Sequence, residues 1–297
     1  MLAEPGIDRA ALLTALKSAY GVSGELTFIP LGWGSVCYRL DDQYFVKLWM
    51  DPESATNALT RFPLVKQLHE SGFRVPYAIP TGSGDLSITT SDGVVAVFPL
   101  LPGRSPDDWT VPLLHQFGHV LARLHSVVPT STLLREDFAV PHQAQRERLL
   151  RLQTAVRRLP QQLVVCHTDL HGSNILVDDA GELSLLDWEG ARLAPPECEL
   201  ALLLQAEQPV DAYQLRHVLE TYPADVPLHL DRFAFFLLRR YVADYTARAS
   251  RLAQGGLTPA DADEAREGMV TWGSAQWEAL ERTLDLVRDT LAQRIVK

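Results

Sequence analysis

The sequence contains few cysteines, and their arrangement would not cross-link a fold. Its 297 residues include three cysteines, Cys37, Cys166 and Cys198, which are far apart and have no C-x-x-C spacing. An odd number with such spacing argues against a disulfide framework and against a cysteine-based zinc site. The pattern favours a reducing compartment, so we expect a cytoplasmic protein.

Long apolar stretches and an excess of basic charge are also missing. No apolar run approaches the ~18 residues of a membrane-spanning helix. The opening residues, MLAEPGIDRAALL, lack the basic and apolar regions of a secretory signal. With 27 Lys and Arg against 37 Asp and Glu, the formal net charge is −10. Nucleic acid and anionic membranes would be repelled, so we expect neither as a partner, whereas this charge permits attraction of a cationic small molecule.

Hydrophobic periodicity divides the chain into a β-rich first third and a helical remainder. A helical pattern covers residues 7–20, strand-like segments follow, and a second helical pattern covers 54–71 before two or three more strands. Beyond Pro102-Gly103 an amphipathic helix is predicted over residues 113–127, and most of the chain after residue 206 has helical composition. These patterns predict an α+β fold of two unequal lobes, residues 1–98 and 99–297.

A short polar loop, CHTDLHGSNIL, precedes an apolar strand. It contains two histidines, an aspartate and an asparagine, namely His167, Asp169, His171 and Asn174. The turn signal DDAG and a second apolar run, LSLLDW, come next. The sequence therefore predicts a hairpin with Asp169 and Asn174 at its entrance and Asp187 at its exit.

These side chains suit phosphoryl transfer. One carboxylate, Asp169, can orient a substrate hydroxyl and accept its proton. The amide oxygen of Asn174 and the carboxylate of Asp187 can hold Mg²⁺ against nucleotide phosphates. The metal is essential to this interpretation, because a loop so rich in acceptors cannot neutralise phosphate charge by itself.

Two upstream segments supply what a phosphate site needs. Lys47, in the strand-like YFVKLW, can place a positive charge against the phosphates. Gly32 and Gly34, in LGWGS, allow the backbone to bend over a nucleotide without an intervening side chain. We expect this turn, with the adjoining Ser35, to bind the nucleotide.

Taken together, these motifs resemble a known family. H-T-D-L-H-G-S-N followed by L-L-D-W is similar to the catalytic loop and metal-binding aspartate of the aminoglycoside phosphotransferase family. That family includes choline kinases and shares the two-lobed protein-kinase-like fold. The likeness is strongest between Val165 and Leu202. Within the family, YFVKLW and DWEGARLAPPECEL look most like the spectinomycin phosphotransferase branch.

The resemblance implies a role for each matching position. Asp169 would be the catalytic base, with Asn174 and Asp187 as magnesium ligands and ATP or GTP as the phosphate donor. The other implied roles are a phosphate-contacting lysine at Lys47, a structural loop histidine at His167, and an adenine-binding hinge at residues 98–101 that includes Phe98 and Leu100.

Two positions depart from the family pattern. The small-lobe helix usually carries a glutamate that pairs with the lysine, but this chain has Thr60 and Arg61 at the aligned position. Glu53 and Glu70 are the nearest alternatives, and neither is well placed. Glu199 stands where many relatives carry aspartate.

Other interpretations remain open at this point. His167 and His171 could ligate a metal with Asp169 in a hydrolase, although no further His or Cys cluster completes such a site. A kinase-like fold could also bind nucleotide without catalysing transfer.

The acceptor is the least determined part of the function. We expect a small hydroxyl compound with a positive charge and predict an aminoglycoside or aminocyclitol. Choline-like, homoserine-like and sugar acceptors stay possible, and neither the choice of nucleotide nor the oligomeric state can be determined from the sequence. The charge argument depends partly on acids that the C-terminal sequence places near two tryptophans, namely Asp261, Asp263, Glu264 and Glu267 beside Trp272 and Trp277. The alternative is that these acids form only the solvated face and first turn of a helix.

Overall fold

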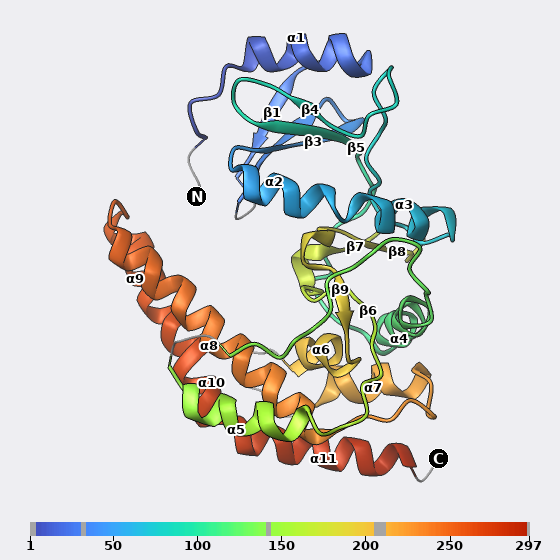
Figure 1. The fold of residues 1–297 in the computed structure, drawn as a ribbon, viewed down its shortest axis with the longest axis vertical. Coiled ribbons are helices and arrows are strands. Elements are labelled where there is room, and N and C mark those ends of the chain that lie inside the picture. The colour runs from blue at the N-terminus through green and yellow to red at the C-terminus, as the bar shows by residue number, and fades with distance from the viewer. Residues whose placement is uncertain (1–3, 31–33, 141–143, 205–211, 296–297) are drawn as a thin grey trace. The chain divides into compact units, whose positions relative to one another are not determined.

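The computed structural model describes residues 4–30, 34–140, 144–204 and 212–295 (Figure 1). Internal contacts separate the chain into two compact units. Unit 1 comprises Met1–Pro106, Pro129–Leu133 and Gly172–Gly190, and unit 2 comprises Asp107–Val128, Leu134–His171 and Ala191–Lys297. The hairpin predicted from the polar loop thus belongs to the unit that contains the N-terminal sheet. The lobe boundary expected between residues 98 and 99 stays a prediction.

Unit 1 is built on a five-stranded antiparallel sheet with the order β1-β2-β3-β5-β4 (Figure 1). Its strands are β1 (Leu26–Ile29), β2 (Val36–Leu40), β3 (Tyr44–Trp49), β4 (Ile88–Thr89) and β5 (Val94–Pro99). The central strand β3 carries Lys47, which lies opposite Cys37 on β2 and Ala96 on β5. Hydrogen bonds on both sides therefore fix the position of this lysine.

Alternation along the strands gives the sheet two apolar faces. On one face, Val46, Val95 and Val97 pack with Leu16 of α1 (Arg9–Tyr20), the helix predicted over residues 7–20. The opposite face holds Trp49, Ala96 and Phe98 against α2 (Pro52–Leu59) and α3 (Phe62–Glu70). Two or three strands were predicted after the second helical segment, and the structure has two, β4 and β5.

The prediction of one continuous helix over residues 54–71 is wrong. The structure has two helices, α2 and α3, separated by Thr60 and Arg61. Pro63 explains the break, because proline has no amide hydrogen to donate and its ring clashes with the preceding helical turn. Asn57 of α2 contacts the Glu189 carbonyl, whereas Phe62 of α3 belongs to the apolar cluster below the sheet that contains Phe98.

The predicted hairpin is present in unit 1. Strands β7 (Ile175–Val177) and β8 (Leu183–Leu185) pair antiparallel, and a 3₁₀ turn, Gly172–Asn174, precedes them. Asp178 Oδ1 accepts the amides of Ala180 and Glu182, which closes the DDAG turn. Such side-chain bonds to the local backbone are typical of aspartate in turns.

Unit 2 is mainly helical and contains a short antiparallel pair, β6 (Val164–Cys166) with β9 (Arg192–Ala194). The predicted amphipathic helix corresponds to α4, and α8 is the longest helix of the unit. Its helices are α4 (Val111–His125), α5 (Arg146–Val156), α6 (Glu197–Leu200), α7 (Tyr213–Thr221), α8 (Leu230–Gln254), α9 (Pro259–Met269), α10 (Ala275–Glu278) and α11 (Leu280–Ile295). Among the residues that the structure describes, no helix has the length and apolarity to cross a membrane.

Candidate active site

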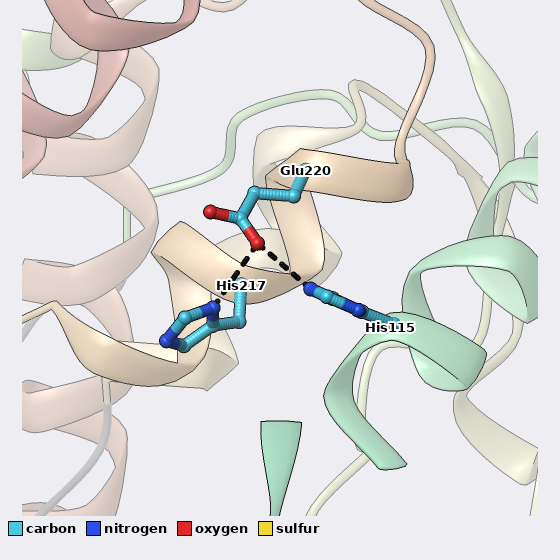
Figure 2. A group of neighbouring side chains, drawn as sticks. All are labelled: His115, His217 and Glu220. Atoms are coloured by element: carbon cyan, nitrogen blue, oxygen red, sulfur yellow. Dashed lines mark hydrogen bonds and ion pairs between the residues drawn. The ribbon is translucent and has the colours of Figure 1, made fainter. Parts of the chain in front are cut away.

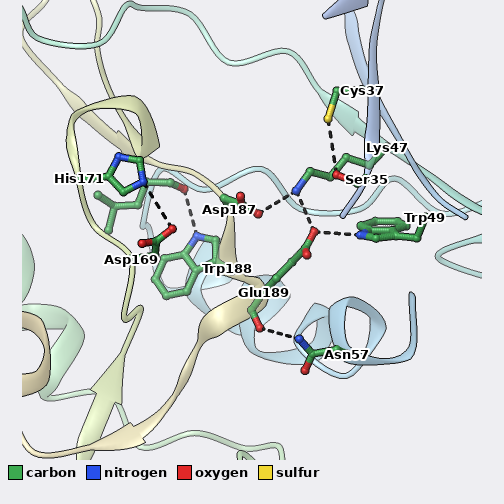
Figure 3. Close-up of polar contacts among 11 residues, drawn as sticks. Ser35, Cys37, Lys47, Trp49, Asn57, Asp169, His171, Asp187, Trp188 and Glu189 are labelled. Carbon is green, nitrogen blue, oxygen red and sulfur yellow. Dashed lines mark hydrogen bonds and ion pairs between the residues drawn. The ribbon is translucent and has the colours of Figure 1, made fainter. Parts of the chain in front are cut away.

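Lys47 lies between two carboxylates of the segment that follows β8 (Figure 3). Its Nζ is 2.8 Å from Asp187 Oδ1 and 2.8 Å from Glu189 Oε1. Trp49 Nε1 also donates to Glu189 Oε1, at 3.0 Å. Burial would lower the pKa of Lys47, but the charges of Asp187 and Glu189 outweigh it and raise that pKa above its ordinary value. The ammonium is therefore fully charged at neutral pH.

Glu189 is the acid that pairs with Lys47 in addition to Asp187. Neither helix glutamate does so: Glu70 pairs with Lys66 on its own helix, and Glu53 is exposed in the first turn of α2. Helix α2 instead contributes Asn57, whose side-chain amide donates to the Glu189 carbonyl at 3.4 Å. Glu189 belongs to the DWEG segment and had no predicted role. Its place two residues after Asp187 is the signal that could have identified it.

The hairpin brings Asn174 next to the segment that carries Asp187. Ile175 lies opposite Leu185, and the Leu186 amide donates to the Asn174 carbonyl at 2.8 Å. Asp187 itself has a φ of 61°, a left-handed conformation that costs a non-glycine residue on the order of 1–3 kcal/mol. Strain of this kind at a position with a charged partner is typical of functional sites.

Asp169 lies in unit 2, where two cationic or hydrogen-bonding side chains contact its carboxylate. Arg240 Nη1 of α8 is 2.8 Å from Oδ1, and His171 Nε2 is 3.5 Å from Oδ2. Burial would raise the pKa of Asp169, but the hydrogen bonds from His171 and Arg240 and the charge of Arg240 lower it below the ordinary range. Asp169 is therefore an ionised hydrogen-bond acceptor at neutral pH. Arg240 was not among the predicted site residues and lies 71 positions further along the chain.

The loop that holds Asp169 is anchored by Glu199. This carboxylate is buried at 2% exposure and accepts the amide of His167 at 2.5 Å and that of Thr168 at 3.2 Å. Thr168 has a φ of 73°, so the backbone turns sharply just before Asp169. His167 is fully buried, and its Nδ1 accepts the Asp169 amide at 3.3 Å. Burial raises the pKa of Glu199 to about 7, although the loop amides act in the opposite direction.

The remaining nucleotide-binding predictions fall in unit 1 or outside the described residues. Gly32 lies outside them, whereas Gly34 has a φ of 98°, a conformation that favours glycine. Ser35 Oγ lies 3.7 Å from Cys37 Sγ. Phe98 is buried against Phe62, and the Leu100 amide donates to the Gln43 carbonyl. A contact between Leu100 and a nucleotide would therefore have to use its carbonyl or side chain.

Unit 2 contains a pocket beside Thr168 and Arg240. Its volume is about 650 Å³, and its wall includes Phe236 and three arginines, Arg192, Arg239 and Arg240. Each arginine has a carboxylate partner. Arg239 forms a two-pronged contact with the buried Glu136, Arg192 lies 3.8 Å from the same carboxylate, and Arg240 contacts both Asp169 and Asp244.

The acids expected to recognise a cation lie on α9 and its first turn. Asp261 takes part in the N-cap of the helix, while Asp263, Glu264 and Glu267 are exposed. Trp277 packs against Tyr245 instead, with ring centroids 5.1 Å apart. This arrangement matches the alternative that these carboxylates form a solvated helix face.

The metal-hydrolase alternative predicts a cluster of His167, His171 and Asp169. Among the residues that the structure describes, the histidine-containing groups whose ligand atoms lie within 4.8 Å of one another are found elsewhere, at His115–His217–Glu220 and at His125–Cys166–Glu199. The hydrolase interpretation therefore gains no support from the geometry.

Comparison with known proteins agrees with these observations. The fold is that of a two-lobed, protein-kinase-like phosphotransferase, as solved structures of that type show. A model of the phosphotransferase enzyme family matches residues 25–236, and the chain therefore belongs to this family. A search of curated proteins finds no match to the sequence.

Several solved structures share the fold at low sequence identity. Spectinomycin phosphotransferase APH(9)-Ia, in complex with ADP and spectinomycin, is 18% identical with a TM-score of 0.73, covering 94% of this chain and 99% of that chain. Amicoumacin kinase hAmiN, in complex with AMP-PNP and Ca²⁺, is 15% identical with a TM-score of 0.70, covering 93% and 94%. Choline kinase LicA from Streptococcus pneumoniae is 14% identical with a TM-score of 0.65, covering 92% and 97%.

Proposed function

We propose that this phosphotransferase is a small-molecule kinase that uses ATP or GTP with Mg²⁺ and transfers the γ-phosphoryl group to a substrate hydroxyl. The observation that carries the proposal is the ion pair between Lys47 and Asp187, 2.8 Å long, at the exit of a hairpin that begins at Asn174. A charged lysine paired with a carboxylate, at a hairpin that also carries an asparagine, is a combination that phosphoryl transfer uses.

The donor atoms of the hairpin fit a magnesium ion. Asn174 and Asp187 offer amide and carboxylate oxygens, which are the ligands that Mg²⁺ prefers. The hydrogen bond from the Leu186 amide to the Asn174 carbonyl, at 2.8 Å, holds the two residues in neighbouring positions of the hairpin. When bound, the ion would neutralise phosphate charge. The ADP, AMP-PNP and Ca²⁺ held by similar structures support a nucleotide with a divalent cation here.

Lys47 and Glu189 form the phosphate-binding side of this proposal. The Glu189 carboxylate accepts hydrogen bonds from both Lys47 and Trp49, and it would keep the ammonium charged and in place if Asp187 bound a metal ion. We infer that Glu189 replaces the helix glutamate that most relatives use. It is a positioning residue that acts through Lys47.

Asp169 is the proposed catalytic base. A carboxylate has about four lone-pair sites, so Asp169 can accept the acceptor hydroxyl while Arg240 and His171 occupy other directions. Its lowered pKa makes it a weak base but a permanent acceptor, which suits orienting the hydroxyl and receiving its proton late in the transfer.

For the acceptor, we propose an aminoglycoside- or aminocyclitol-type compound with a positive charge. The net charge of −10 and the likeness to a spectinomycin-bound kinase support this choice. In the pocket beside Arg240, the carboxylates of Glu136, Asp169 and Asp244 offset the three arginines, so a cation is not repelled there.

A coupled assay of nucleoside diphosphate release tests this function. The panel contains aminocyclitols, choline-like amines, homoserine-like amino acids and sugars, each with ATP and with GTP. Each cationic acceptor is paired with a neutral analogue of the same shape. Equal kcat/KM for the two members of a pair would refute the charge preference, and no turnover in the presence of bound magnesium nucleotide would favour a non-catalytic role.

A further inference from the structure

Two histidines and a glutamate to which the proposed phosphoryl transfer assigns no role meet on unit 2 (Figure 2). His115 comes from α4, while His217 and Glu220 lie one turn apart on α7. Both imidazoles point at the same carboxylate oxygen: His115 Nε2 is 2.7 Å and His217 Nδ1 is 3.2 Å from Glu220 Oε2. The three ligand atoms lie within 4.8 Å of one another.

The packing of α4 against α7 brings these groups together. Gly118 allows the close approach, since a side chain there would clash with Thr221 Oγ1 and with the Val218 carbonyl. The Thr221 hydroxyl donates to the carbonyl of His115 at 2.8 Å, which fixes that turn of α4 against α7. On α7, the spacing of three residues places His217 and Glu220 on one face. The site is thus supported by close packing of the two helices and by a hydrogen bond between them at His115.

We propose that His115, His217 and Glu220 bind a divalent transition-metal ion, Zn²⁺ being the ion that best suits the donor set. Two imidazole nitrogens and one carboxylate oxygen are ligands that zinc takes in three-ligand sites, with water in the fourth position. Bonds of roughly 2.0–2.2 Å in a tetrahedron separate neighbouring ligand atoms by about 3.4 Å. The present separations of 2.7 and 3.2 Å from Glu220 need only small side-chain movements to reach that value.

Partial exposure makes the three groups accessible to an ion from solution. The side chains of His115, His217 and Glu220 are 36%, 17% and 32% exposed. The donor set also differs from the all-oxygen set of Asn174 and Asp187. Ligand chemistry would therefore favour Mg²⁺ at the oxygen ligands and a transition-metal ion at the imidazoles. Imidazole nitrogens favour zinc, cobalt, nickel and copper over magnesium.

A metal ion at this position would join two helices that are about a hundred residues apart in the chain. Because the unfolded chain does not hold the three ligands together, the ion would bind the folded form and stabilise it in proportion to its concentration over Kd. We therefore expect a structural role for the ion, independent of phosphoryl transfer.

Metal binding is measured on the full chain after treatment with a chelator. Isothermal titration with Zn²⁺ should show one ion bound per chain, and Mg²⁺ should not compete with Zn²⁺ for the site. Thermal unfolding with Zn²⁺ present should show a raised Tm. Titration with Co²⁺ should give visible absorption bands of a nitrogen- and oxygen-ligated ion. His217→Ala and Glu220→Gln should each weaken zinc binding by at least about 100-fold, since losing even an outer partner of a metal ligand costs ~10–100-fold.

His119→Ala is the matched control, because His119 is exposed and lies one turn after His115 on the same helix. It should leave the affinity, the stoichiometry and the Co²⁺ spectrum unchanged. If His119→Ala weakens binding while His217→Ala does not, the ion is held by the two histidines of α4 and the proposal is wrong. Equal zinc affinity of the wild type and Glu220→Gln would also overturn it, as would the absence of zinc binding by the wild type.

Discussion

Replacing Glu136 by glutamine should destabilise unit 2 and change the charge of its pocket. The carboxylate is fully buried and receives both terminal nitrogens of Arg239 at 2.8 Å, as well as the Phe138 amide at 2.6 Å. Burial would raise the pKa of Glu136, but the Arg239 contacts outweigh it and lower that pKa. A glutamine keeps one acceptor oxygen and loses the negative charge.

The magnitude follows from these contacts. Removing one partner of a buried pair costs ~3–5 kcal/mol, and Arg239 is 22% exposed, so we expect the lower end, about 3 kcal/mol. For a unit of this size, that corresponds to a Tm lower by roughly 6–12 °C. Glu147→Gln, which changes an exposed glutamate of α5, should stay within about 0.5 kcal/mol of the wild type.

The sign of the pH dependence provides a second readout. Because the folded pKa of Glu136 is lowered, its contribution to stability is present above the unfolded pKa of about 4.3 and is lost as the pH falls through the folded value. The difference in Tm between the wild type and Glu136→Gln should therefore shrink on acidification.

Glu136→Gln also tests how the pocket treats charge. It removes a negative charge shared by Arg239 and Arg192, which line the pocket. A unit charge about 8 Å from a bound ammonium, at an effective dielectric of about 40, is worth on the order of 1 kcal/mol. KM for a cationic acceptor should rise several-fold, and KM for its neutral analogue should not. Equal Tm values for the variant and the wild type would refute the reasoning about stability, and equal changes in the two KM values would refute the reasoning about charge.

Three further predictions concern the residues around the proposed chemistry. Asp169→Asn should lower kcat by ~10²- to 10⁴-fold while nucleotide Kd, measured by titration calorimetry, stays within about twofold, because asparagine is a poor base. Glu189→Gln should raise KM for the nucleotide more than it lowers kcat, because Lys47 loses one of its two carboxylate partners. Steady-state kinetics at varied nucleotide measures both constants, and a fall in kcat larger than the rise in KM would contradict this role. Arg240→Gln should move the acidic limb of the kcat/KM–pH profile upwards, since Arg240 is among the groups that lower the pKa of Asp169, and an unmoved limb would assign that limb to another group.

Local patterns predicted the hairpin and the helix α4 correctly. Strand alternation and the turn signal DDAG are short-range features, so they can be read without knowing the tertiary structure. The break between α2 and α3 was also visible in the sequence at Pro63, but the apolar period across it suggested one helix. Proline determined the outcome because its effect on the backbone is stronger than a periodic pattern.

The contacts between distant residues could not be predicted in the same way. Glu189 reaches Lys47 across 142 positions, and Arg240 reaches Asp169 across 71. The local signal is weak in both cases, since an acid two residues after Asp187 and an arginine on a long helix are also common on solvated surfaces. The family pattern suggested a helix glutamate as the partner of Lys47, and the chain provides the charge from a different segment.

The most direct test of the central claim follows phosphorus through the reaction. Wild-type protein, magnesium nucleotide and each acceptor of the panel are incubated together, and ³¹P NMR identifies the products. We predict a new phosphate monoester on an acceptor hydroxyl, formed with one nucleoside diphosphate per ester. Its formation should be abolished by removal of the divalent cation and strongly slowed in Asp169→Asn. Ester formation at an equal rate in Asp169→Asn, or none by wild-type protein that binds magnesium nucleotide, would contradict this prediction.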